Sequence, residues 1–96
     1  MEQMKTLGEI IANLSEFDPD ETIYATEPWT EKSTAIVAME PEDADLPEEA
    51  IRAGMAYLLE IFIALEVIED WLPTQDGIPT STEICNRVIE YAINDA

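Results

Sequence analysis

The longest apolar stretch of the chain lies between Pro47 and Leu72, and its pattern predicts one long helix. Residues 55–65 contain a single charged side chain, that of Glu60. At about 100° per residue, the apolar positions fall on two sides of such a helix. One side carries Ile51, Met55, Leu58, Phe62 and Leu65, and the other carries Ala56, Leu59, Ile63 and Val67. We therefore expect a central helix with two apolar surfaces, both of which must be buried.

A shorter helix is predicted near the N-terminus. Thr6 and Glu9 have the spacing of a capping box, in which the hydroxyl and the carboxylate each accept a hydrogen bond from the other's backbone amide. Apolar residues then recur at helical spacing as far as Phe17. The helix should end at Asp18, because a residue that precedes proline avoids helical geometry.

Residues 21–26 and 33–39 predict two antiparallel strands of a hairpin. Both segments alternate and are rich in β-branched or aromatic residues. The second strand is apolar on both faces, which is typical of a strand covered on both sides. Two strands alone form a marginal sheet, so we expect further elements to cover them, with a symmetry mate as a reasonable source.

A second capping box, Thr80 to Glu83, begins a C-terminal helix with a broad apolar face. Glu83 and Arg87 also have the favourable i,i+4 order for an ion pair. Altogether the pattern predicts one α+β domain over residues 1–96. Its element order is α-β-β-α-α, with a small single-layer sheet packed on helices.

The charge of the chain is strongly negative. It has 22 acidic residues against four basic ones, no histidine and a formal net charge of −18. Such a surface repels phosphate backbones and anionic lipid, so nucleic-acid and membrane binding are disfavoured. The acidic residues could instead bind a basic protein partner, bind a divalent cation or simply keep the protein soluble.

Carboxylates gather at two places that are candidates for an acidic patch. Glu66, Glu69 and Asp70 share one face in the last turns of the predicted long helix, where the helix dipole favours cations instead. Asp43 and Asp45 lie in the acidic linker before that helix, without the spacing of a calcium loop. As a functional site, the patch would bind either a partner's lysine or arginine or a divalent ion. The alternative is that these carboxylates are simply solvated and have no binding role.

Nothing in the sequence indicates an enzyme or a bound cofactor. Cys85 is the only cysteine, and without histidine it lacks the usual activating base. With three glycines the chain has no glycine-rich phosphate loop. A single cysteine and an N-terminus without a signal-peptide pattern predict a cytoplasmic protein.

Two hypotheses for function follow. In the first, the protein is a homo-oligomer, most simply a dimer, that acts by protein–protein interaction through the second face of the long helix. Its interface candidates are Leu59, Ile63 and Val67, with Trp29 and Trp71 as aromatic anchors. In the second, it is an immunity- or antitoxin-type inhibitor whose acidic surface captures a basic protein.

Overall fold

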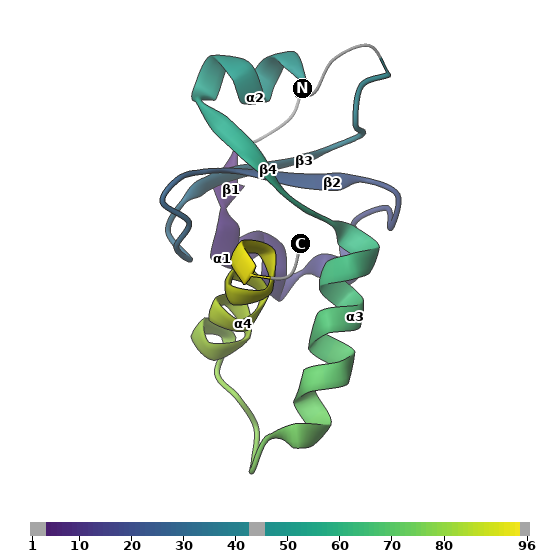
Figure 1. Ribbon diagram of the computed structural model, residues 1–96, viewed down its shortest axis with the longest axis vertical. Coiled ribbons are helices and arrows are strands. Elements are labelled where there is room, and N and C mark those ends of the chain that lie inside the picture. Colours follow the sequence, from purple (N-terminus) through teal and green to yellow (C-terminus); the bar gives the residue numbers. More distant parts are fainter. Residues whose placement is uncertain (1–3, 43–45, 95–96) are drawn as a thin grey trace.

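The computed structural model describes residues 4–42 and 46–94, which form a four-stranded antiparallel sheet with helices on both faces (Figure 1). The strands lie in the order β1 (Lys5–Thr6), β3 (Thr34–Ala38), β2 (Thr22–Thr26) and β4 (Met55–Glu60). The predicted α+β class is therefore confirmed.

Most helices lie below the sheet in the view of Figure 1. These are α1 (Leu7–Ala12), α3 (Ile61–Trp71) and α4 (Ser81–Asn94), whereas the short α2 (Glu48–Ala53) lies above the sheet. Two 3₁₀ turns, η1 (Leu14–Glu16) and η2 (Leu72–Thr74), follow α1 and α3. The main core lies between the sheet and the lower helices, and a smaller core under α2 contains Tyr24, Ile36, Ala50 and Met55.

Both predicted capping boxes are present. At α1, the Glu9 amide donates to Thr6 Oγ1 (3.2 Å), and Glu9 Oε1 accepts from the Thr6 amide (3.0 Å). The bond from the Thr6 amide, together with one that the Thr6 hydroxyl donates to Glu9 Oε1 (3.0 Å), holds the pKa of the Glu9 carboxyl below its usual value, because both bonds favour the ionised form. At α4, Thr80 and Glu83 exchange the equivalent bonds at 2.8 and 3.1 Å.

The predicted hairpin is also confirmed. Strand β2 pairs with β3 in the register Ile23↔Val37 and Tyr24↔Ile36. Strand β3 is covered on both faces, as its pattern predicts, since Val37 belongs to the lower core and Ile36 to the upper one. The strands that flank the hairpin, however, are β1 and β4 of the same chain, so a symmetry mate is not needed to complete the sheet.

The prediction of a single helix from Pro47 to Leu72 is wrong. That segment forms α2, then strand β4, then α3. Helix α2 ends at Gly54, whose backbone is left-handed with φ 70°, and the chain then turns to run antiparallel to β2. A segment that is apolar on two sides fits a strand covered on both faces as well as a buried helix, and pairing with β2 decides between them.

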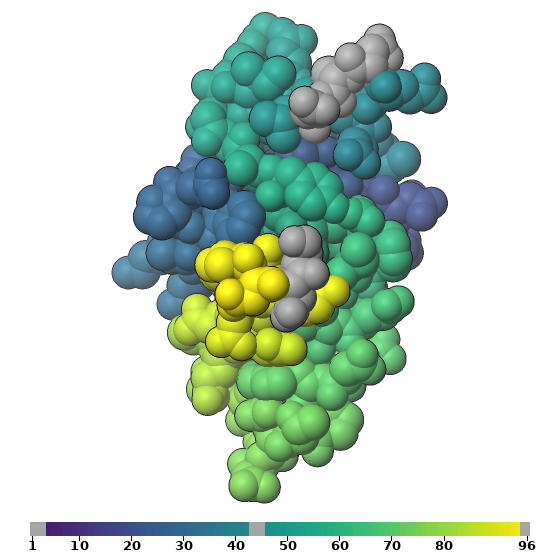
Figure 2. All heavy atoms as spheres, viewed as in Figure 1, coloured from purple at the N-terminus to yellow at the C-terminus, as the bar shows by residue number. Residues whose placement is uncertain are grey.

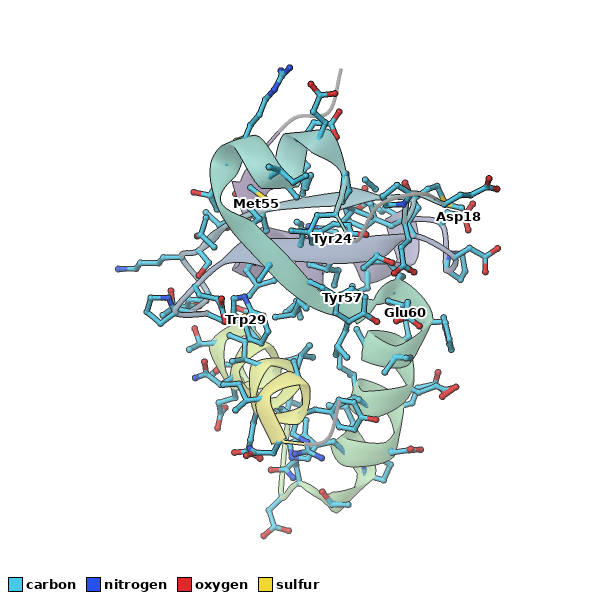
Figure 3. The ribbon with its side chains drawn as sticks, turned by 45° about the horizontal axis from the view of Figure 1, so that its top comes forward. Asp18, Tyr24, Trp29, Met55, Tyr57 and Glu60 are labelled. Carbon is cyan, nitrogen blue, oxygen red and sulfur yellow. The ribbon has the colours of Figure 1, made fainter. Side chains whose placement is uncertain are left out.

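A β-bulge in β4 makes this burial possible. Ile23 pairs with Leu59 and the next β2 residue, Tyr24, pairs with Tyr57, so Leu58 is an extra residue in β4. Leu58 and Leu59 are consecutive, yet both belong to the lower core and each is 1% exposed. Tyr57 remains on the upper face, where its ring packs edge-to-face on Tyr24 with centroids 6.2 Å apart (Figure 3).

Candidate binding groove between α3 and α4

A surface groove with a volume of about 390 Å³ lies between α3 and α4. Side chains fill most of the space that separates the two helix ribbons (Figure 2). Helix α3 provides Ile63, Glu66, Val67, Asp70 and Trp71; Thr74 follows it, and α4 provides Arg87 and Tyr91.

Helical spacing explains why these side chains meet. Ile63, Val67 and Trp71 lie four residues apart, and Glu66 and Asp70 repeat the same interval beside them. On α4, Arg87 and Tyr91 are likewise four residues apart. Each helix therefore directs one stripe of side chains into the groove.

The groove combines an apolar floor, aromatic sides and an acidic rim. Val67 is buried at 7% exposure, Ile63, Trp71 and Tyr91 are half-buried, and Glu66 and Asp70 are exposed. A smaller cavity of about 270 Å³ shares Trp71 and Arg87 with the groove and adds Glu83, Asn86 and Glu90. The two cavities thus form one continuous surface, which we call the α3–α4 groove.

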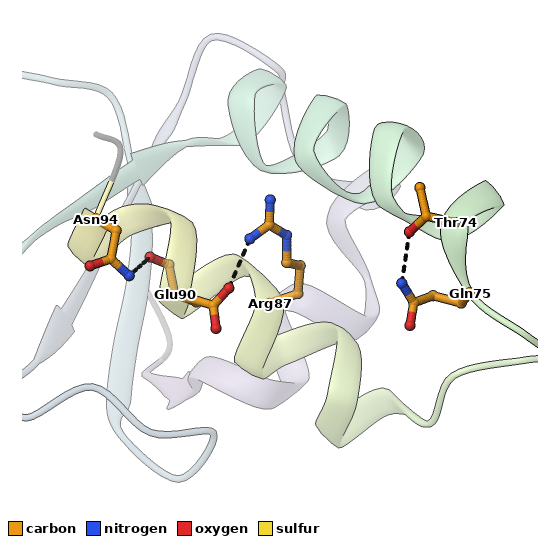
Figure 4. Close-up of polar contacts among 5 residues, drawn as sticks. All are labelled: Thr74, Gln75, Arg87, Glu90 and Asn94. Atoms are coloured by element: carbon orange, nitrogen blue, oxygen red, sulfur yellow. Dashed lines mark hydrogen bonds and ion pairs between the residues drawn. The ribbon is translucent and has the colours of Figure 1, made fainter.

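Arg87 is the basic residue of this groove. Its side chain extends from α4 towards α3, and Nη1 donates to Glu90 Oε1 at 2.9 Å (Figure 4). The predicted pairing of Arg87 with Glu83 is not formed, because the Glu83 carboxylate accepts from the Thr80 amide at the start of α4. Since Arg87 is balanced by Glu90, the carboxylates of Glu66 and Asp70 leave the groove with a net negative charge.

The groove brings together five of the predicted site residues. Ile63, Val67 and Trp71 were expected at an interface, and Glu66 and Asp70 in an acidic patch. Arg87 and Tyr91 complete the groove, although sequence analysis did not select them. Their i,i+4 spacing on a helix was visible, but only the packing of α4 on α3 shows that they face Glu66 and Asp70.

The remaining candidates lie elsewhere. Leu59 lies in β4 and is a core residue with 1% exposure. The prediction that Leu59 is an exposed interface residue is therefore wrong. Trp29 is half-buried against the lower core, and its Nε1 donates to the Ala25 carbonyl at 3.2 Å (Figure 3). Glu69 is exposed on α3 outside the groove lining. Asp43 and Asp45 lie outside the described residues.

The described residues give no support to a metal site at Glu66, Glu69 and Asp70. Over residues 4–42 and 46–94, no three histidine, cysteine or acidic side chains come together in a way that could hold an ion. The Cys85 thiol is buried below the sheet, where desolvation, with a smaller effect of Glu31, raises its pKa to about 11. At neutral pH this thiol is protonated and therefore a poor nucleophile.

Glu60, the single charge in the apolar stretch, ends β4 and immediately precedes α3, where it is half-buried. Glu60 therefore does not lie within a helix, as the predicted helix from Pro47 to Leu72 would require. Figure 3 shows Glu60 at the strand–helix junction.

No helix within the described ranges has both the length and the apolar character needed to cross a membrane. Comparison of the chain with protein-family models, curated proteins and solved structures found no match. Any conclusion about function therefore depends on the groove and on the charge of the surface.

Proposed function

We propose that this chain is a non-enzymatic, acidic binding protein whose α3–α4 groove receives a basic side chain of a protein partner. The observation that carries the proposal is the composition of the groove, in which exposed Glu66 and Asp70 lie beside an apolar floor and two aromatic rings.

These features match the two parts of a lysine or arginine side chain. The aliphatic stem of such a residue packs on apolar surface while its charged head stays near water. Ile63 and Val67 offer that surface, and Glu66 and Asp70 offer carboxylates for the head. Trp71 and Tyr91 add ring faces, which attract cations.

The charge of the whole molecule supports a basic partner. A formal net charge of −18 on 96 residues attracts a cationic surface over several ångströms and speeds the encounter of the two proteins. A partner of this kind would be blocked wherever the acidic chain covers its basic site, as in immunity- or antitoxin-type inhibition. A free, buried cysteine is typical of reducing compartments, and we place this function in the cytoplasm.

The test uses a fluorescein-labelled peptide of alternating lysine, arginine and glycine, with binding followed by fluorescence anisotropy at low salt. The double variant Glu66→Gln/Asp70→Asn should weaken binding about fivefold, since exposed charge pairs contribute about 1 kcal/mol or less each. The matched control is Glu48→Gln/Glu49→Gln, which removes the same charge from α2 on the opposite side of the sheet.

If the two double variants weaken binding equally, only the overall charge attracts the peptide, and the α3–α4 groove is not the site. A Trp71→Ala variant separates the aromatic contribution from the charge, because it leaves the net charge unchanged. We expect it to weaken binding at both low and high salt.

A further inference from the structure

Strand β4 forms an open edge of the sheet. It pairs with β2 on one side, and on its other side the described residues provide no backbone partner for Met55–Glu60. On the opposite edge of the sheet, β1 pairs with Thr34 and Ala35 of β3. An open edge presents a row of unpaired amide and carbonyl groups that can pair with another strand.

This edge has little protection against pairing. Proteins usually place charges, proline or a bulge on such a strand. β4 has the bulge at Leu58, but it contains no proline, and its residues from Met55 to Leu59 are uncharged. Beside the edge, Tyr57 is 37% exposed and Phe62, at the start of α3, is 43% exposed. An added strand would therefore gain both backbone hydrogen bonds and apolar contact.

The two ends of β4 differ in charge. Glu60 ends the strand, and the adjoining turn from Asp18 to Glu21 is held against the start of α3, since the Ile61 amide donates to the Glu21 carbonyl at 2.9 Å. Glu40 follows β3 at the same end of the sheet. Burial raises the pKa of the Tyr24 phenol, and the charges of Glu40 and Glu60 add smaller effects in the same direction. None of the four basic residues of the chain belongs to these segments.

We propose that the open edge of β4 binds an extended segment of another protein as an additional antiparallel strand, and that this segment carries basic residues at its N-terminal end. Because β4 runs towards Glu60, the N-terminal end of an antiparallel strand lies beside Glu60, and the acidic turn at Asp18–Glu21 adds negative charge from the β2 side of the same end. Charge complementarity also favours this occupant over a second copy, which would bring another net charge of −18 to the same edge. This inference does not depend on the α3–α4 groove.

The experiment compares three peptides on the ¹⁵N-labelled chain. The peptide KRTVTVT has the proposed polarity, and TVTVTRK has the same composition with its charges at the wrong end. The third is KRTVTVT with methyl groups on alternate backbone nitrogens, which removes edge hydrogen bonds but keeps every side chain. Amide shifts and hydrogen-exchange protection are measured residue by residue.

KRTVTVT should protect amides within Met55–Glu60 and do so at lower concentration than TVTVTRK, and the methylated peptide should leave these amides unprotected. Glu60→Gln should weaken KRTVTVT by about threefold, as expected for one partly exposed charge pair, whereas Glu49→Gln on α2 should leave its affinity nearly unchanged. Glu66→Gln/Asp70→Asn, in the α3–α4 groove, should leave it nearly unchanged as well.

Three results would overturn this inference. The first is equal protection of Met55–Glu60 by the methylated peptide, which would exclude strand pairing. The second is loss of KRTVTVT binding in Glu66→Gln/Asp70→Asn, which would place the peptide in the groove. The third is protection of β4 that rises with protein concentration in the absence of peptide, because this would identify a second copy as the occupant.

Discussion

Among the individual residues, Cys85 shows how burial determines chemistry. A lone cysteine without histidine in the sequence already indicated a structural role. The structure adds the reason, since the side chain is 1% exposed in the core between the sheet and α4 and its pKa is raised to about 11. Tyr24, under α2, has a raised pKa for the same main reason, with an opposing effect of the nearby Thr22 hydroxyl.

The raised pKa of Cys85 predicts a loss of stability at alkaline pH. In the unfolded chain the thiol loses its proton near pH 9, whereas in the folded chain it keeps the proton until about pH 11. The stabilisation is therefore fully present below pH 9 and lost as pH rises towards 11. Two pKa units correspond to about 2–3 kcal/mol of unfolding free energy.

Urea unfolding at pH 8, 9.5 and 10.5 measures this effect in the native chain and in Cys85→Ala. The variant loses packing at every pH, but its unfolding free energy should fall less steeply between pH 8 and 10.5. The raised pKa of Tyr24 affects both proteins in the same way, so the difference between the two slopes isolates Cys85. Identical slopes would show that the thiol is not shielded as the structure indicates.

The individual site residues could be predicted only in part. Glu66, Asp70, Ile63 and Val67 were predicted from their spacing, which holds because all four lie in α3, whereas Trp71 was predicted only as an aromatic anchor. Leu59 was assigned to the same helix face, but it lies in β4, where alternation and a bulge direct it into the core. The face on which a side chain lies can thus be predicted only where the sequence also predicts correctly whether the segment is a helix or a strand.

Among the elements, local signals were sufficient for the starts of two helices and for the hairpin, whereas the first helix ends at Ala12 and not, as predicted, at Asp18. Both capping boxes and the hairpin are determined within short windows, by hydroxyl–carboxylate pairs and by alternation. The segment after Gly54 is different, because Met, Ala and Leu are good helix formers. It becomes a strand since β2, distant in sequence, offers it hydrogen bonds and since both of its faces are then covered.

Gly54 provides a direct test of this break between α2 and β4. Its φ is 70°, and no atom lies within 4 Å of the position that a Cβ would take, so backbone strain alone opposes Gly54→Ala. We expect this substitution to cost about 1 kcal/mol. Within one continuous helix it would instead stabilise the protein by up to about 1 kcal/mol.

The sign of the change in urea unfolding free energy therefore distinguishes the two arrangements. Ala53→Gly is the calibration, because Ala53 is helical in both and should lose stability in either case. If Gly54→Ala is the more stable protein, the left-handed end of α2 is contradicted.

For the molecule as a whole, the side of the apolar stretch that was expected to drive self-association is largely covered by its own chain, whereas Tyr57 and Phe62 of the same stretch remain exposed. Leu59 and Val67 are 1% and 7% exposed, and Ile63 is half-buried at the floor of the groove. The exposed apolar face from which self-association was predicted is therefore absent among these three residues. Self-association stays a prediction, and no interface for it is proposed. The most distinctive property of the exterior is its negative charge, and most of the described carboxylates have no ion-pair partner. The described residues contain two ion pairs, Arg52–Glu48 and Arg87–Glu90.

This excess of like charge predicts that salt stabilises the fold. A net charge of −18 repels itself most strongly in the compact state, and salt screens that repulsion. The thermal midpoint should rise between 10 and 500 mM NaCl, concentrations chosen so that the Debye length falls from about 30 Å to below 8 Å. A gain of about 1 kcal/mol corresponds to about 4–8 °C for a domain of this size.

Differential scanning calorimetry measures this midpoint, with sucrose as the uncharged control for general effects of solutes on hydration. A midpoint that is flat or falls with NaCl would contradict the prediction. It would show that the carboxylates are better compensated in the folded chain than the two observed ion pairs indicate.

The amino-acid sequence alone determined the α+β class, the hairpin, both helix caps and the acidic surface. Each of these depends on composition or on residues a few positions apart. The tertiary structure decided that residues 55–60 form a strand, that α3 and α4 share a groove and that one sheet edge remains open. These depend on contacts between segments far apart in the chain, and no local preference encodes which of them will meet.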